Sequence, residues 1–122
     1  MGIDHIFQSP LLIVTIRGFS TCEEIIGAFD ELALDDRITS TESIIFDLLY
    51  ADYAPAEEEL KRIAEHLGSL AALRVKRWAV AAQQVSIMFG KIRLLYAFMK
   101  SNGLAAELFP SFTKAMTWAL LG

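Results

Sequence analysis

Short runs of apolar residues, rich in β-branched side chains, alternate along this chain with longer amphipathic stretches. The short runs predict strands at residues 3–8, 11–17, 43–50, 77–83 and 105–109. The longer stretches predict helices at about residues 20–34, 55–70, 87–101 and 111–121. This alternation predicts an α/β fold: a mixed, mostly parallel sheet of about five strands with about four helices on its two faces, in the order β-β-α-β-α-β-α-β-α.

Local patterns mark the ends of two of these helices. Ser20 is followed by Glu23 in the spacing of a capping box, so we expect the first helix to begin there. The third helix is followed by Asn102 and Gly103, which are typical of a helix C-terminus. These signals place both helices between predicted strands.

The central part of the chain combines a very apolar strand with a strongly charged helix. Residues 43–50 (SIIFDLLY) are nearly all apolar, as expected of a strand that is buried on both faces. Pro55 suits the first turn of the helix that follows. On this helix Glu58 and Arg62 are four residues apart, which predicts an ion pair along its surface.

Length, composition and charge exclude several classes of protein. With 122 residues, the chain is expected to form one domain over residues 1–122. Its hydrophobic content is 54% and its mean hydropathy is +0.41, but no window suits a membrane span, so we expect no stable membrane insertion. The net charge of −4 argues against a nucleic-acid partner. With no signal peptide evident and Cys22 alone, a cytoplasmic setting is predicted.

The residue types that carry chemistry are sparse. The two histidines, His5 and His66, have no ligand spacing, and we interpret them as structural or surface residues. Cys22 is expected in the first turn of a helix, where a thiolate is favoured, but a lone cysteine is more often a small core residue. No nucleophile elbow, phosphate-binding loop or pair of catalytic acids is present. The sequence therefore predicts no catalytic residues, no cofactor, no metal and no enzymatic activity.

Polar residues gather at the end of the central strand. Asp47 interrupts an otherwise apolar run, and a buried carboxylate is costly unless it is hydrogen-bonded. It is either part of a binding face, since ligands bind at the carboxyl ends of parallel strands, or an acceptor for loop amides. Tyr50, Asp52 and Tyr53 follow at the same edge and either line that face or cover the start of the next helix.

The third helix carries two stripes at helical spacing. Met88, Ile92, Leu95 and Met99 form an apolar stripe that is typical of a core face. A second stripe, which we call the aromatic–basic stripe, consists of Phe89, Arg93, Tyr96 and Lys100. It is consistent with a partner or dimer interface, a lipid-headgroup contact or the side of an apolar cavity. The alternative is that basic stems cover a partly buried aromatic pair.

A succession of motifs from about residue 10 onward also resembles a known family. The motifs are Gly18-Phe19-Ser20-Thr21, Phe46-Asp47-Leu48, Trp78-Ala79-Val80, residues 89–96 (FGKIRLLY), and Phe109 with Ala115 and Trp118-Ala119-Leu120. Together they resemble the SpoIIAA-like family, which is related to STAS (anti-anti-sigma) and CRAL-TRIO/SEC14-like domains. The resemblance implies a small cytoplasmic bacterial protein that is regulatory or binds a hydrophobic ligand.

One departure from the anti-anti-sigma pattern limits what the resemblance implies. Those proteins carry a phosphorylatable Ser or Thr after the central strand, whereas residues 50–56 here offer only tyrosine hydroxyls. The first hypothesis is a non-enzymatic regulatory domain that binds a protein partner or itself, as a homodimer, through the aromatic–basic stripe. The alternative is a carrier or sensor of a hydrophobic, lipid-like small molecule.

Overall fold

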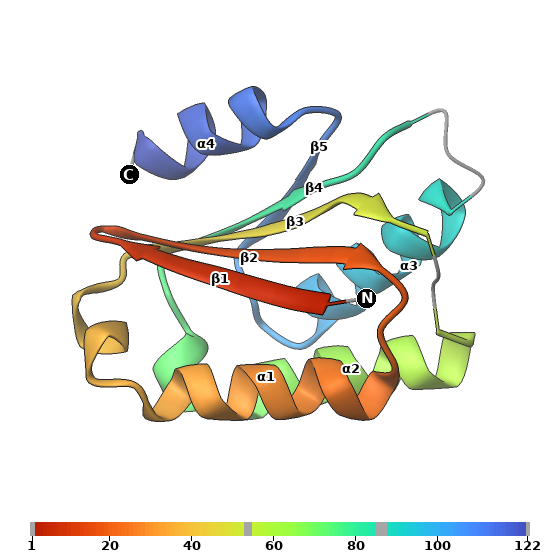
Figure 1. Cartoon of the computed structure of the whole chain (residues 1–122), viewed down its shortest axis with the longest axis horizontal. Helices are drawn as coiled ribbons and strands as arrows, with labels where there is room; N and C mark the ends of the chain where they lie inside the picture. Colours follow the sequence, from red (N-terminus) through yellow and green to blue (C-terminus); the bar gives the residue numbers. More distant parts are fainter. Residues whose placement is uncertain (1, 53–54, 85–87, 122) are drawn as a thin grey trace.

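Five strands and four α-helices make up the part of the chain that the structure, a computed structural model, describes: residues 2–52, 55–84 and 88–121. Two short 3-10 helices, η1 and η2, join them (Figure 1). The elements in chain order are β1 (Gly2–Gln8), β2 (Leu11–Gly18), α1 (Cys22–Leu34), η1 (Asp36–Ser40), β3 (Ser43–Ala51), α2 (Glu57–Ser69), η2 (Ala71–Leu73), β4 (Arg77–Ala81), α3 (Phe89–Ser101), β5 (Ala106–Phe109) and α4 (Phe112–Leu120). The predicted α/β class and element order are confirmed.

The strands are arranged in the sheet in the same order as in the chain, β1-β2-β3-β4-β5. β1 pairs antiparallel with β2, and every later neighbour is parallel. Right-handed crossovers that always step in the same direction place their helices on the same face of a sheet. Accordingly α1, α2 and α3 cover one face, whereas α4 follows the last strand and covers the other (Figure 1). The mixed, mostly parallel sheet with helices on both faces was predicted correctly.

The two faces of the sheet have cores of different size. The larger core lies under α1, α2 and α3, and its centre is an aromatic group of Phe29, Phe46 and Trp78, all at most 1% exposed. The smaller core lies under α4, where Ala115 and Ala119 allow the helix to approach the sheet closely. Because β3 is covered on both sides, residues 43–48 are all buried, as their apolar pattern predicted.

The helix signals were correct in kind, but two were displaced. Pro55 precedes the N-cap residue Ala56 of α2 and does not lie in the first turn of that helix. The capping box of α1 is formed by Thr21 and Glu24, not by Ser20 and Glu23. Thr21 Oγ1 accepts a hydrogen bond from Glu24 N (3.1 Å), and Glu24 Oε1 accepts one from Thr21 N (2.8 Å). Ser20 is only 3% exposed and belongs to the buried approach to the helix. With Thr21 as the N-cap residue, Cys22 is the first residue of α1, and its side chain is buried in the core.

The end of α3 follows the prediction. Gly103 has a φ of +83°, which is easy for glycine, and its N–H donates to the carbonyl of Lys100 at 3.1 Å. The N–H of Leu104 donates to the carbonyl of Met99 at 3.1 Å. These two bonds form a Schellman motif, which satisfies the last carbonyls of the helix.

The predicted ion pair along α2 does not form as expected. Arg62 Nη1 lies 3.0 Å from Oε2 of Glu23 on α1 and therefore links two helices. This partner could not be found from spacing within α2, because Glu23 is 39 residues away in sequence.

A search of the described residues finds no helix that is long and apolar enough to cross a membrane.

Candidate functional site

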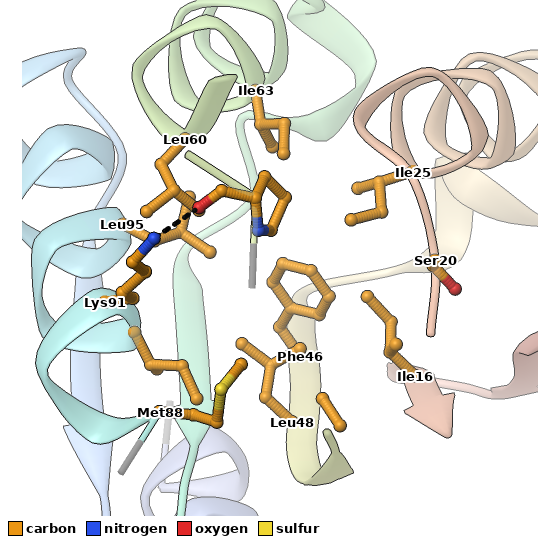
Figure 2. A pocket seen from close by; sticks show the side chains of 13 residues that line it. Ile16, Ser20, Ile25, Phe46, Leu48, Leu60, Ile63, Met88, Lys91 and Leu95 are labelled. Atoms are coloured by element: carbon orange, nitrogen blue, oxygen red, sulfur yellow. Dashed lines mark hydrogen bonds between the residues drawn. The ribbon is translucent and has the colours of Figure 1, made fainter. Parts of the chain in front are cut away.

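An apolar pocket opens at the carboxyl ends of β2 and β3, on the face that carries the three crossover helices (Figure 2). The strands contribute Ile16, Phe46, Leu48 and Ala51. The first two turns of the helices α1, α2 and α3, with the segments before them, contribute the other lining residues: Ser20, Ile25, Pro55, Leu60, Ile63, Met88, Lys91, Ile92 and Leu95. We call this set of residues the apolar pocket.

The position of the apolar pocket follows from the topology. Each parallel strand delivers the chain to the same edge of the sheet, and each crossover helix begins there. At the end of β2, Gly18 takes a φ of +69°, a conformation that glycine adopts without strain, and the chain turns toward α1. The N–H of Asp52, just after β3, donates to the carbonyl of Gly18 at 3.1 Å, so the ends of β2 and β3 stay together.

The walls of the apolar pocket are almost entirely hydrocarbon. Among its described lining residues, only Ser20 and Lys91 have polar side chains. The space between the walls is about 470 Å³ with the open mouth included, but only about 30 Å³ of it is wide enough for the centre of a water molecule. That space admits one or two waters, so a larger occupant requires the side chains at the mouth to move.

Lys91 lies at the mouth of the apolar pocket. Its Nζ donates to the carbonyl oxygen of Pro55 at 3.5 Å, so it bridges α3 and the start of α2 (Figure 2). No ion pair among the described residues includes Lys91, and the first turn of α3 has no acidic residue. The first turns of α1 and α2, by contrast, each contain glutamates.

Asp47 lies close to the apolar pocket in sequence but on the other face of the sheet. Its neighbours Phe46 and Leu48 point into the pocket, and strand residues alternate between faces. The carboxylate is buried, accepting hydrogen bonds from the N–H of Leu49 (3.1 Å) and from the hydroxyl of Thr15 (3.4 Å). Asp47 therefore holds the end of β3. The predicted role as a hydrogen-bond acceptor is present, but its described donors belong to the strands β2 and β3 and not to loop amides.

Tyr50 and Asp52, the described candidates that follow at this edge, do not line the apolar pocket. The Tyr50 side chain is exposed, and the guanidinium of Arg17 lies 5.4 Å from the centre of its ring. Asp52 is exposed, and its described contact is the backbone bond that holds the turn. Tyr53 lies outside the described residues.

The aromatic–basic stripe of α3 runs toward β5. Phe89 and Tyr96 are half-buried and pack against the larger core, whereas Arg93 and Lys100 are exposed. Lys100 Nζ donates to the Tyr96 hydroxyl (3.3 Å), which donates to a carboxylate oxygen of Glu107 on β5 (3.4 Å). The two aromatic rings therefore have intramolecular partners, and the exposed charges are the part of the stripe left for other contacts. Three members of the predicted apolar stripe of α3, Ile92, Leu95 and Met99, lie in the core. The fourth, Met88, is the N-cap residue that precedes the helix and is half-buried.

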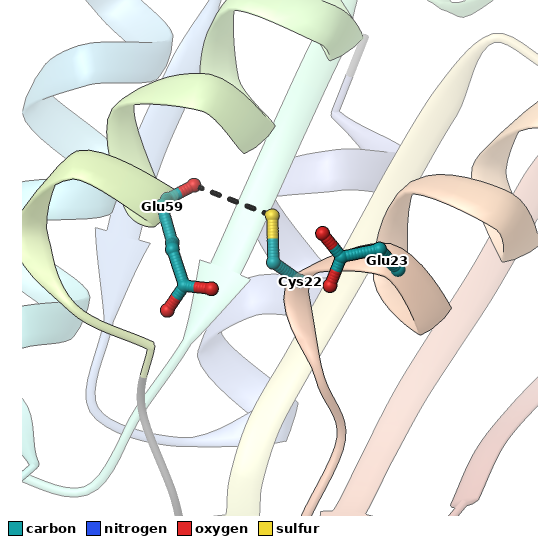
Figure 3. Close-up of side chains that lie close together, drawn as sticks. All are labelled: Cys22, Glu23 and Glu59. Atoms are coloured by element: carbon teal, nitrogen blue, oxygen red, sulfur yellow. Dashed lines mark hydrogen bonds between the residues drawn. The ribbon is translucent and has the colours of Figure 1, made fainter.

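Three potential metal ligands meet between α1 and α2: Cys22 Sγ and one carboxylate oxygen each of Glu23 and Glu59 lie within 4.8 Å of one another (Figure 3). Burial is the main factor that raises the pKa of the Cys22 thiol, which donates to the carbonyl of Glu59 at 3.8 Å. The hydrogen bond from Arg62 lowers the pKa of Glu23. A cation here would have to displace both the thiol proton and the Arg62 contact.

The histidines have separate surroundings. Nε2 of His66 lies 2.6 Å from Oδ1 of Asp30, a contact that links α2 to α1. His5 on β1 packs edge-on to Phe7, with ring centroids 5.8 Å apart. The two rings belong to different elements and do not form a shared site.

The sequence analysis did not single out the apolar pocket. The periodicity of the sequence does not distinguish its wall residues from core residues, because both kinds lie on the same buried faces of the strands and helices. One signal was available: Lys91 is one of two basic residues, with Arg93, in a largely apolar stretch, and it lies next to Ile92 of the core stripe. That position places a charge at the boundary of a buried surface.

Comparison with known proteins finds no matching protein-family model, no matching curated protein and no matching solved structure. The resemblance to the SpoIIAA-like family therefore stays a prediction. The α/β architecture rests on the structure itself.

Proposed function

We propose that the protein binds a small, largely apolar molecule in the apolar pocket. The observation that carries this proposal is a hydrocarbon-lined opening at the carboxyl ends of parallel strands, where α/β proteins bind their ligands.

The side chains at the mouth of the apolar pocket are flexible, so the mouth can widen. Met88 and Lys91 are long, flexible side chains near the first turn of α3, and a methionine side chain adapts to irregular shapes. The deeper wall, by contrast, is made of rigid core residues such as Phe46, which is 1% exposed. We therefore expect a ligand to enter by displacing side chains of α3 rather than by opening the sheet.

Two measurements test this function. Native mass spectrometry of gently purified protein should show an extra mass that is lost on denaturation, and the neutral dye Nile red should bind the emptied protein and be displaced by 1-decanol. Ala51→Phe places a large ring among the lining residues and should abolish dye binding. Ala28→Phe, at a half-buried position of α1 outside the lining, is the matched control and should retain it.

Thermal unfolding of both variants shows whether they remain folded. Dye binding that survives in a folded Ala51→Phe variant, or a wild-type protein that binds neither Nile red nor 1-decanol, would exclude the apolar pocket as a binding site.

We also propose, as a second function, a regulatory role through self-association. The exposed Arg93 and Lys100 present a basic stripe on a chain whose net charge is −4. The first turn of α2 presents exposed Glu57 and Glu58, which could contact this stripe in a second copy. The partner is therefore a second copy of the chain, and its test is given in the Discussion.

A further inference from the structure

We infer that the ligand is a single-chain molecule with one negatively charged head, such as a medium-chain carboxylate, and that Lys91 binds this head at the mouth of the apolar pocket. The inference rests on the proposed binding function. It adds the charge of the ligand and the residue that recognises it.

The first argument is the polarity of the lining. The described lining residues include one charged side chain, and it lies at the mouth rather than in the depth of the apolar pocket. A wholly apolar ligand would gain nothing from an ammonium group at this position. An amphiphile would place its chain against hydrocarbon and its head against the cation, so both parts would have matching surroundings.

The second argument is the state of the Lys91 ammonium group. Its described contact is with a neutral carbonyl at 3.5 Å, the outer limit of a hydrogen bond. A carboxylate is a stronger acceptor for an ammonium group than a carbonyl oxygen, because the bond is assisted by charge. The head of an anionic ligand would therefore replace Pro55 as the partner of Lys91.

The third argument is the field at the start of α3. Lys91 is the third residue of this helix, where the positive end of the helix dipole disfavours a cation. The first turn of α3 contains no acidic residue that would offset the positive charge of Lys91 and the positive end of the helix dipole. An anion bound at the mouth would neutralise both of them.

The apolar pocket is narrow. Only about 30 Å³ of its space is wide enough for the centre of a water molecule, so a ligand enters by displacing side chains at the mouth. A single slender chain requires the smallest displacement, which favours a single-chain ligand. The experiment uses a free carboxylate as the probe for the negative head.

The experiment compares three probes with the same chain: decanoate, 1-decanol and decyltrimethylammonium. Each is titrated below its micelle concentration into the wild-type protein preloaded with Nile red. We expect decanoate to bind about fivefold more tightly than 1-decanol, the upper end of what an exposed charge pair contributes, and the cation to bind most weakly. Added salt should weaken decanoate binding and leave 1-decanol binding unchanged.

Three variants assign the effect to Lys91. Lys91→Met keeps the stem without the charge and should abolish the preference for decanoate, so that this variant binds decanoate and 1-decanol equally. Lys91→Arg keeps the charge and should preserve the preference. Lys114→Met removes the lysine at the same third position of α4, on the other face of the sheet, and should have no effect.

The outcomes separate the two proposals. Equal binding of decanoate and 1-decanol by the wild-type protein would overturn the anionic head while leaving the binding function in place. A preference for decanoate that persists in Lys91→Met would overturn the role of Lys91. Absence of binding by all three probes would overturn the binding function and the inference with it.

Discussion

The side chains of Phe46 and Asp47, consecutive residues of β3, lie on opposite faces of the sheet. The ring of Phe46 is a wall of the apolar pocket and meets the ring of Phe29 edge-on, with centroids 5.3 Å apart. Asp47 bonds to Thr15 and to the backbone of Leu49 on the other side. The strand thus separates a site that could bind a ligand from a carboxylate that holds the strand end.

Asp47→Ala should destabilise the protein without affecting ligand binding. The change leaves the N–H of Leu49 and the hydroxyl of Thr15 without this acceptor in a buried region, which costs about 1–3 kcal/mol. Urea unfolding measures the loss, and 1-decanol titration at a temperature where the variant is folded measures binding. A large loss of 1-decanol affinity in the folded variant would mean that Asp47 belongs to the site after all.

A matched pair on α1 tests the larger core. Leu32 is 4% exposed and Leu34 is 85% exposed, although they are two residues apart on the same helix. Leu32→Ala should lower the free energy of unfolding by about 2–5 kcal/mol. Leu34→Ala should change it by less than about 0.5 kcal/mol. Equal effects in urea unfolding would contradict the placement of α1 against the sheet.

Asp35 should titrate well below an ordinary aspartate. Hydrogen bonds from the Arg37 side chain, then from its backbone N–H, lower the pKa of Asp35 from 3.8 to about 2. The folded state therefore binds this proton more weakly than the unfolded chain, so the contribution to stability is complete above about pH 5 and is lost as the pH falls from about 4 to about 2.

An NMR titration of the Asp35 side-chain carboxyl carbon measures this pKa directly. In Arg37→Gln the midpoint should move up toward 3.8, because the charged donor is gone. An unchanged midpoint in that variant would show that Arg37 does not cause the shift.

Cys22 should be protected from thiol reagents in the folded protein. The side chain is 1% exposed, and burial raises the pKa of its thiol, so both access and ionisation are low. Reaction with Ellman's reagent at pH 8 should be slower than in denaturant by about a hundredfold or more, because it requires local opening. Comparable rates in the two conditions would place Cys22 outside the core.

Arg93→Glu tests the second proposed function without disturbing the core, because the side chain is exposed. Sedimentation velocity should show a dimer for the wild-type protein and a monomer for the variant, with equal thermal unfolding. Lys61→Glu makes the same change of charge on the exposed face of α2 and should remain dimeric. A monomeric wild-type protein, or an unchanged dimer in Arg93→Glu, would exclude the stripe as the interface.

The sequence alone was sufficient for the element order and the fold class. Periodicity identified every strand and α-helix, because the apolar residues of β3 and the stripes of α2 and α3 reflect burial that is repeated along the chain. Local sequence signals predicted features that depend on neighbouring residues only, such as the end of α3 at Gly103. The capping box was displaced by one residue, since Ser20 and Thr21 both offer a hydroxyl three residues before a glutamate.

Only the tertiary structure decided which of these residues meet. Lys91 and Pro55 are 36 residues apart, and Arg62 and Glu23 are 39 apart, so no spacing rule connects either pair. The strand order brings the starts of α1, α2 and α3 to one edge, and that meeting creates the apolar pocket from residues that look like ordinary core residues in sequence. Periodicity reports whether a side chain is buried, because burial repeats with the geometry of its own element. It does not report what the side chain is buried against, because that depends on how the elements pack.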